Sequence, residues 1–393
     1  MRLSKDNLTI RYAGIQFFYW MLFGDVVGFV SVYLLDDGFS NTQIGILLAV
    51  SGILAALLQP LLAGYADLEK SPSLKSLLSI FLVIQLILGI LLILTYHRAG
   101  LFTGLFYGCS IIVMQLSTPF VNALGMESTN QGKKLNFGAA RGLGSVGYAV
   151  AAWLIGMTVA RLGSIFLPVS IMAVAAALLL CLRLFPFEKL PKQVEEKTDY
   201  SGGGLLYFIR KYRRFCITLL GCILIYVSHV LLNSFTIQIV TDKGGGSAQM
   251  GTAMAMASLI ELPTMFLFTW MLKKLRCDVW FRLSGIFFFL KTLGTLLAPN
   301  IPVFYGVQIF QMFGWALITV SSVYYVNSIM EKQDVIKGQA YMTMTYTLGS
   351  VIGALLGGTL IDGAGVTAML VFASAAAGAG AVIMLFATEC AQE

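Results

Sequence analysis

Long apolar runs, separated by short polar connections, make up almost the whole chain. Twelve of these runs are long enough to cross the ~30 Å core of a bilayer as helices of about 20 residues. The predicted spans are 10–35, 43–66, 74–96, 101–126, 137–160, 163–186, 213–240, 247–273, 279–299, 301–329, 339–362 and 365–388. The pattern therefore predicts an all-α, polytopic membrane protein of twelve transmembrane helices.

A polar stretch at 187–212 divides the predicted spans into six and six. Pro191, a Ser-Gly-Gly-Gly run and charges of both signs are typical of a linker. We therefore expect a six-helix bundle over 1–186, a cytoplasmic linker over 187–212 and a second six-helix bundle over 213–393. Transporters built from two such halves bind their solute near the membrane midplane.

The composition agrees with a protein that dissolves in lipid. Hydrophobic residues make up 58% of the chain and charged residues only 11%, with a mean hydropathy of +0.83, whereas soluble domains are roughly 25% charged. The six cysteines show no spacing typical of a disulfide framework or a metal site. The net charge of +7 suits anionic lipid headgroups, so we expect no nucleic-acid partner.

The basic residues predict the orientation. Most of the 26 Lys and Arg residues lie at the N-terminus, in the even-numbered connections and at the adjoining helix ends. The exceptions are Arg98, Arg161 and Lys243 on the other side and Arg141 and Lys291 within spans. The positive-inside rule then puts both termini in the cytoplasm. We expect an integral protein of a bacterial cytoplasmic membrane that functions as a monomer and keeps its first span uncleaved.

Ionisable residues inside spans are the best candidates for function, because each costs at least ~2.5 kcal/mol near a helix centre when charged. Five such residues are present: Asp25, Arg141, His229, Glu261 and Lys291. Each has a structural alternative. Lys291 and Glu261 can form an ion pair between neighbouring helices, and His229 can be a packed, hydrogen-bonded core residue.

Further polar and aromatic residues accompany the ionisable ones at helical spacing. Arg141 and Tyr148 are seven residues apart, so two helical turns bring them to one face of the span 137–160. Asn233 follows His229 by one turn, and Trp315 follows Gln311 in the same way. Such polar stripes in apolar helices line a cavity or form hydrogen bonds between helices.

Four stretches resemble one transporter family. They are FFYWMLFGD (17–25), GILLAVSGILAALLQPLLAGYAD (45–67), TPFVNALGMES (118–128) and NFGAARGLGSVGYAVAAWLIG (136–156). With the placement of Glu261 and Lys291, they are similar to lactose permease and its relatives, the oligosaccharide:proton symporters of the major facilitator superfamily. The resemblance implies the major facilitator fold and transport by alternating access.

The resemblance also implies roles in the first half. Arg141 matches the family's sugar-binding arginine. Tyr148 lies where the family has a tryptophan that stacks on the sugar ring. Asn122 replaces a glutamate that pairs with the arginine, and it keeps the capacity to bind sugar hydroxyls. Asp67 matches the acidic residue of the conformational loop motif, although Leu68 stands where a basic residue is usual.

In the second half the match is partial. Glu261 matches a glutamate implicated in sugar binding and proton coupling. Lys291 stands in for an arginine, and His229 takes the place of an aspartate. The family's proton-coupling histidine and glutamate are here Gln311 and Gly314. We therefore expect the proton to be coupled elsewhere.

These residues predict proton-coupled uptake of a sugar or small oligosaccharide, with the proton as coupling ion and no cofactor or metal. Asp25 is the first candidate for proton coupling, exchanging Arg141 as its partner, and Glu261 is the second. The predicted solute-binding residues are Asn122, Arg141, Tyr148, His229, Asn233, Glu261, Lys291, Gln311 and Trp315.

Other functions stay open. A nucleoside or another polar solute suits the same side chains, and the loss of the family's proton site leaves an uncoupled facilitator as an alternative. A proton-coupled exporter is less favoured, because the GPxxGG-type motif is missing from 137–160. An enzyme is not expected, since the chain has two histidines, no HExxH and no phosphate-binding glycine loop.

Overall fold

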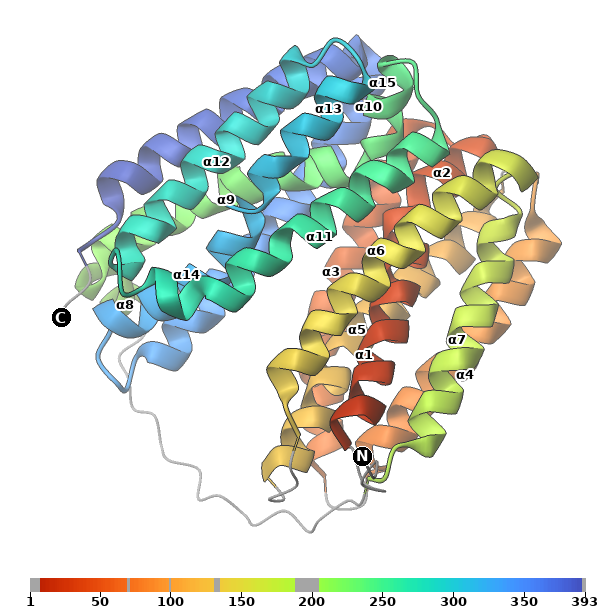
Figure 1. Cartoon of the computed structure of the whole chain (residues 1–393), viewed down its shortest axis with the longest axis horizontal. Coiled ribbons are helices and arrows are strands. Elements are labelled where there is room, and N and C mark those ends of the chain that lie inside the picture. Colours follow the sequence, from red (N-terminus) through yellow and green to blue (C-terminus); the bar gives the residue numbers. More distant parts are fainter. Residues whose placement is uncertain (1–7, 69–70, 99, 131–134, 188–204, 391–393) are drawn as a thin grey trace, which may run out of the picture. The chain divides into compact units, whose positions relative to one another are not determined.

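The chain folds into helices that form two compact units. The structure, a computed structural model, describes residues 8–68, 71–98, 100–130, 135–187 and 205–390, and within these residues it contains no strand (Figure 1). The first unit comprises Met1–Gln193 and Gly245–Leu259, and the second comprises Val194–Gly244 and Ile260–Glu393. The all-helical prediction is confirmed, whereas the division into two bundles of six stays a prediction.

The first unit is built mainly from the elements before residue 193. These are α1 (Leu8–Phe23), the π-helix η1 (Gly24–Gly28), α2 (Val30–Asp36), α3 (Asn41–Asp67), α4 (Leu74–Thr95), α5 (Leu101–Asn130), α6 (Phe137–Leu162) and α7 (Phe166–Leu184). Polar side chains begin several of them. Ser40 forms a capping box with Gln43 at the start of α3, and Asn136 caps α6.

The second unit holds most of the remaining elements. These are α8 (Leu205–Lys211), α9 (Arg213–Ser234), α10 (Thr236–Asp242), α11 (Ser247–Met271), α12 (Cys277–Leu297), α13 (Ile301–Val307), the 3₁₀-helix η2 (Gln308–Gln311), α14 (Trp315–Ile329) and α15 (Val335–Ala387). The first part of α11, up to Leu259, belongs to the first unit.

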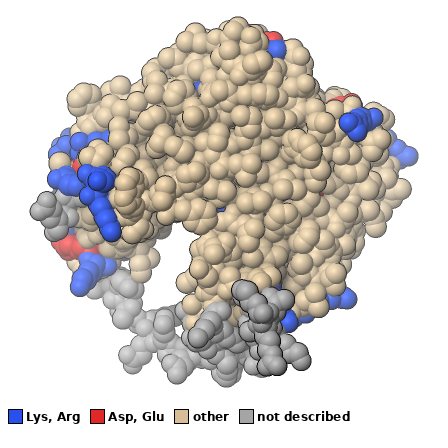
Figure 2. Space-filling model, viewed as in Figure 1, with Lys and Arg blue, Asp and Glu red and all other residues tan. Residues whose placement is uncertain are grey.

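Ten helices among the described residues are long and apolar enough to cross a membrane, or up to eleven if the bent pair at the N-terminus is one span. Gly365 divides α15 into two helical segments, because its φ of 84° lies outside the helical region. The prediction of twelve spans therefore stays untested as a count. On the face drawn in Figure 2, charged side chains lie toward the helix ends and leave the middle almost uncharged.

Three of the predicted spans are broken helices. The span 10–35 consists of α1, η1 and α2, with a bend of 40°. The span 213–240 breaks at Phe235, and the span 301–329 passes through η2 and a non-helical Gly314 before α14 begins. Backbone groups freed at such breaks must find other partners in lipid, so breaks are common beside binding sites.

Close packing of glycines joins α1 to α6 and α9 to α15. A Cβ on Gly147 would lie 2.2 Å from the backbone oxygen of Phe17, and one on Gly349 would lie 2.6 Å from the Cβ of Tyr226. Only a glycine fits at either contact. Helices with small residues on their shared face can approach closely in a membrane, where packing drives association.

The predicted linker 187–212 lies mostly outside the described residues, and its last part forms α8. Lys211, at the end of α8, pairs with Glu331 at 2.8 Å and with Asp334 at 2.9 Å. Tyr212 also donates a hydrogen bond to Asp334. The Lys211 ammonium holds the pKa of the Asp334 carboxyl below its usual range. These contacts fix the beginning of the second unit to the connection between α14 and α15.

Candidate functional site

In the first unit, one chain of side-chain contacts connects α1, α5 and α6. Gln16 on α1 donates a hydrogen bond to the Oδ1 atom of Asn122 on α5, at 3.4 Å. Its own Oε1 accepts one from the indole Nε1 of Trp20, at 3.1 Å. The guanidinium carbon of Arg141 on α6 lies 4.0 Å from the centre of the Trp20 ring. Asn122 and Arg141, both predicted from the sequence, therefore belong to one cluster.

Tyr148 and Asp25, two further predicted residues of this unit, lie at the π-helix η1 that follows α1. Tyr148 lies against the break: a Cβ on Gly24 would be 3.3 Å from its ring. Asp25 is fully buried, and its Oδ2 accepts a hydrogen bond of 2.8 Å from Ser170 on α7. Its Oδ1 has no hydrogen-bond partner among the described residues. In this structure Arg141 lies on Trp20 and Asp25 accepts from Ser170, and the exchange of Arg141 as a partner of Asp25 stays a prediction.

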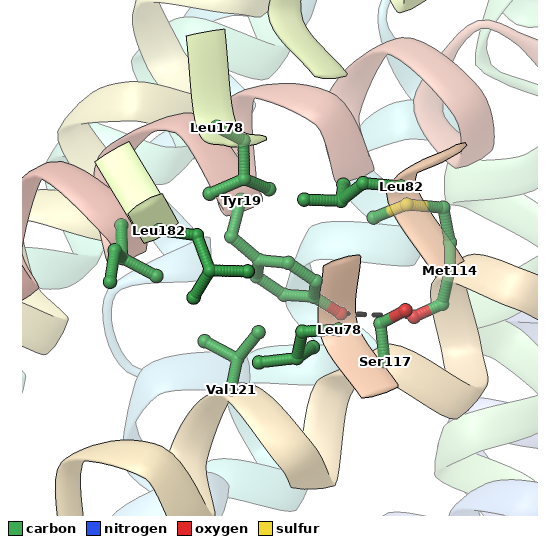
Figure 3. Close-up of a pocket in the computed structure, with 9 residues that line it drawn as sticks. Tyr19, Leu78, Leu82, Met114, Ser117, Val121, Leu178 and Leu182 are labelled. Atoms are coloured by element: carbon green, nitrogen blue, oxygen red, sulfur yellow. Dashed lines mark hydrogen bonds between the residues drawn. The ribbon is translucent and has the colours of Figure 1, made fainter. Parts of the chain in front are cut away.

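A small apolar pocket lies beside α1, at Tyr19 (Figure 3). Its lining includes Tyr19, Leu78, Leu82 and Val121. The Tyr19 hydroxyl donates a hydrogen bond to the backbone oxygen of Met114, at 3.0 Å. Because the pocket wall is almost entirely apolar and the hydroxyls of Tyr19 and Ser117 already bond to backbone oxygens, this pocket does not suit a polar solute.

In the second unit, three predicted residues form a buried hydrogen-bonded row. Lys291 on α12 donates to the Oε1 atom of Gln311 at 2.5 Å, and the Nε2 atom of Gln311 donates to Glu261 on α11 at 2.7 Å. All three are at most 9% exposed. The amide of Gln311 thus lies between a cation and an anion. Its oxygen accepts from the ammonium of Lys291, and its nitrogen donates to the carboxylate of Glu261. A row of this kind satisfies the buried charges, as the structural alternative requires, and it also offers polar groups to a solute.

Aromatic rings surround a histidine beside this row. The rings of His229 and Trp315 stack in parallel, 4.2 Å apart with an angle of 2° between them. Asn233 lies within hydrogen-bond distance of the imidazole, 2.8 Å from its Nε2 atom. Tyr226 and Tyr346 lie edge to face at 5.4 Å, and Trp315 lies within 6.2 Å of both. The predicted His229, Asn233 and Trp315 therefore come together.

Asp67, predicted as the acidic residue of the loop motif, is the last residue of α3, and its side chain lies outside the described part of the structure. Lys75, which follows the same connection, donates hydrogen bonds to the backbone oxygens of Arg183 and Phe185 at 3.0 and 2.8 Å. It binds the C-terminal end of α7, where a cation is favourable.

Gln16, Trp20 and Tyr346 were missed by the sequence reading. Gln16 is fully buried inside a span, and a buried amide in an apolar helix is itself a sign of a polar network. Trp20 follows it by one helical turn. Tyr346 carries no such signal, because its role depends on α15 lying against α9.

The two clusters offer similar chemistry. Each combines a cation, amide groups and aromatic faces, which together suit a ring-shaped solute with hydroxyl groups. Within the described residues, no group of three or more His, Cys, Asp or Glu side chains has the arrangement of a metal site.

Comparisons with known proteins agree with this description. The MFS_1 like family matches residues 9–372. A search among curated proteins gave no match. The fold is similar to a mutant form of the nucleoside transporter NupG, with a TM-score of 0.81 and 17% identity over 96% of this chain and 98% of that one. NupG itself gives 0.77 and 18% over 97% and 98%.

A third similar structure is an auto-inhibited POT family peptide transporter, with a TM-score of 0.71 and 13% identity over 99% of this chain and 98% of that one. At these identities the structures establish a shared fold. With the family match over nearly the whole chain, they identify the protein as an integral membrane protein of the MFS_1 like family, a secondary transporter of the major facilitator superfamily.

Proposed function

We propose that this transporter takes up a sugar or small oligosaccharide together with protons. The main support is that each unit has a cluster of buried or partly buried polar side chains beside aromatic rings. In the first unit Arg141 lies on Trp20, which is linked through Gln16 to an amide. In the second unit the Glu261–Gln311–Lys291 row accompanies the stacked ring of Trp315. Sugars need many hydrogen bonds and a flat apolar face, and both clusters supply them.

Two buried carboxyl groups are candidates for proton coupling. Glu261 accepts a hydrogen bond from Gln311, which in turn binds Lys291. Protonation of Glu261 removes the charge that strengthens this hydrogen bond, so proton uptake can rearrange the row. Asp25 has one oxygen on Ser170 and one without a partner among the described residues. A proton on that second oxygen would remove the cost of a buried, half-satisfied carboxylate.

The test is uptake into proteoliposomes containing the purified protein. The panel consists of labelled lactose, melibiose, galactose, uridine and adenosine, each with and without an inward proton gradient. We expect one of the sugars to accumulate only with the gradient. Equilibration regardless of the gradient would make the protein a facilitator, and movement against an inward gradient would make it an exporter.

The coupling residues are tested by Asp25→Asn and Glu261→Gln. The coupling variant should still equilibrate solute but lose gradient-driven accumulation, because an amide cannot carry the proton. Asp242→Asn is the matched control, since Asp242 is exposed at the end of α10. Undiminished accumulation in both variants would assign the two carboxyl groups to structure.

A nucleoside is the second candidate. The parallel stack of His229 and Trp315 is the geometry that a flat base extends with little rearrangement. Two of the similar structures are of a nucleoside transporter, although the likeness is one of fold. Accumulation of uridine or adenosine without any sugar would replace the sugar proposal by this one.

A further inference from the structure

Trp20 is held in one orientation by contacts on two sides. Its indole Nε1 donates to Gln16, which is fully buried and bonds to Tyr12 at 2.6 Å and to Asn122 at 3.4 Å. A side chain anchored by its polar edge cannot rotate freely, so little conformational entropy is lost when a ligand binds to it. Trp20 is only partly buried, so part of this side chain is exposed.

The α6 side of the indole is fully occupied. Arg141 lies 4.0 Å from the ring centre, and a Cβ on Gly144 would be 2.4 Å from the indole Cδ1 atom. Gly144 therefore leaves room for the ring, and Arg141 covers it. The guanidinium is planar and carries its N–H donors in a fixed fork, a geometry that suits hydroxyl oxygens.

Trp20 has a counterpart in the second unit. The helix break at Phe29 corresponds to the break at Phe235, and the left-handed Gly38 corresponds to Gly244, at one and the same separation in the sequence. At this separation Trp20 corresponds to Tyr226. Tyr226 is one of the rings around Trp315. Between α6 and α15 the separation is that of the left-handed Gly163 and Gly365, and at this separation Gly144 corresponds to Tyr346. An aromatic ring therefore covers Tyr226 where Arg141 and Gly144 cover Trp20.

We propose that Trp20 is the aromatic platform of the first unit, on which the ring of the solute stacks, while Arg141 backs the indole and binds the solute's hydroxyl groups. The inference rests on the proposed function and specifies a solute with a flat ring face. It replaces Tyr148 in that role, because the Tyr148 ring packs against the glycine of the broken helix. Gln16 is a positioning residue that fixes the indole.

The test compares Trp20→Leu and Trp20→Phe with Trp153→Leu. Trp153 lies on α6 and is 50% exposed, so it is a matched control away from the cluster. For whichever panel solute the wild type takes up, Trp20→Leu should raise KM by about tenfold and Trp20→Phe by less, since a phenyl ring keeps part of the stacking. Trp153→Leu should leave KM unchanged.

An unchanged KM in Trp20→Leu would contradict the proposal that the solute stacks on Trp20. A lower KM would also contradict it, because Trp20 would then cover Arg141 and compete with the solute. A second measurement applies if Trp20→Leu does not fold. The solute-induced change in tryptophan fluorescence should shrink in Trp20→Phe and persist in Trp153→Phe, and a full change in Trp20→Phe would overturn the proposal. If the wild type moves no solute of the panel, the proposed function fails, and the platform fails with it.

Discussion

In both clusters a charged side chain contacts a neutral group. Arg141 lies on the face of an indole, and an amide separates Lys291 from Glu261. Two adjacent full charges would bind each other strongly in a low dielectric and would compete with a solute. An indole or an amide holds a charge less tightly, so a neutral, hydroxyl-rich solute can displace or extend these contacts.

If Arg141 binds the solute as proposed, its planar shape should matter as well as its charge. Arg141→Lys keeps the charge but loses both the stacked face and the fork of donors, so we expect KM for the transported solute to rise by about tenfold or more. Arg161→Lys is the control, because Arg161 is exposed in the last turn of α6. Uptake kinetics of the three proteins at equal amounts of folded transporter give the comparison, and equal KM values would remove Arg141 from the site.

At the scale of the helices, the sequence predicted where apolar segments lie but not where they break. The spans ending near residues 35, 240 and 329 each read as one helix, because apolar composition continues through the break. The breaks depend on tertiary contacts that a hydropathy pattern does not contain. Phe29 and Phe235 adopt similar non-helical backbone angles, with φ of −106° and −113°.

Several of the predicted site residues lie at or near these breaks. Asp25 lies within the π-helix, Asn233 two residues before Phe235, and Gln311 and Trp315 on either side of a turn. Asp25, Asn233 and Gln311 were found because a charged or amide side chain stands out in an apolar span, and Trp315 was found because it follows Gln311 at helical spacing. Trp20 and Tyr346 were not, because aromatic side chains in apolar helices are usually packing residues.

The stability of the first unit should depend on the close glycine packing between α1 and α6. Gly147→Val forces a side chain into the backbone of Phe17, where a Cβ alone would be 2.2 Å from the oxygen. Overpacking of this kind typically costs ~1–3 kcal/mol. Gly64→Val is the control, since a Cβ there meets no atom within 4 Å. Thermal unfolding in detergent should give a lower Tm for Gly147→Val than for Gly64→Val, and equal values would contradict the importance of this contact.

At the scale of the whole molecule, left-handed glycines and close glycine contacts recur at corresponding positions of both units. Gly163 ends α6 and Gly365 divides α15 with nearly identical backbone angles, φ of 82° and 84° with ψ of 173°. Gly147 and Gly349, separated by the same number of residues as this pair, make the corresponding close helix contacts. The two predicted halves thus share backbone geometry at these positions, which a count of apolar spans alone does not reveal.

The orientation of the molecule in the membrane can be tested with a native reporter. Cys390 is exposed near the C-terminus, and Arg276 and Arg282 beside it lower the pKa of its thiol, which increases the reactive thiolate fraction. If the positive-inside prediction is correct, a membrane-impermeant maleimide should label Cys390 in inside-out vesicles but not in intact cells. Cys390→Ser shows how much of the signal comes from this residue.

Arg98→Cys in a Cys390→Ser background reports on the other side. Arg98 is exposed in the connection between α4 and α5, one of the few basic residues expected outside the cytoplasm. This variant should be labelled in intact cells. Labelling of Cys390 from outside, together with protection of the cysteine at position 98, would show that both termini lie outside the cytoplasm. The positive-inside prediction would then be wrong.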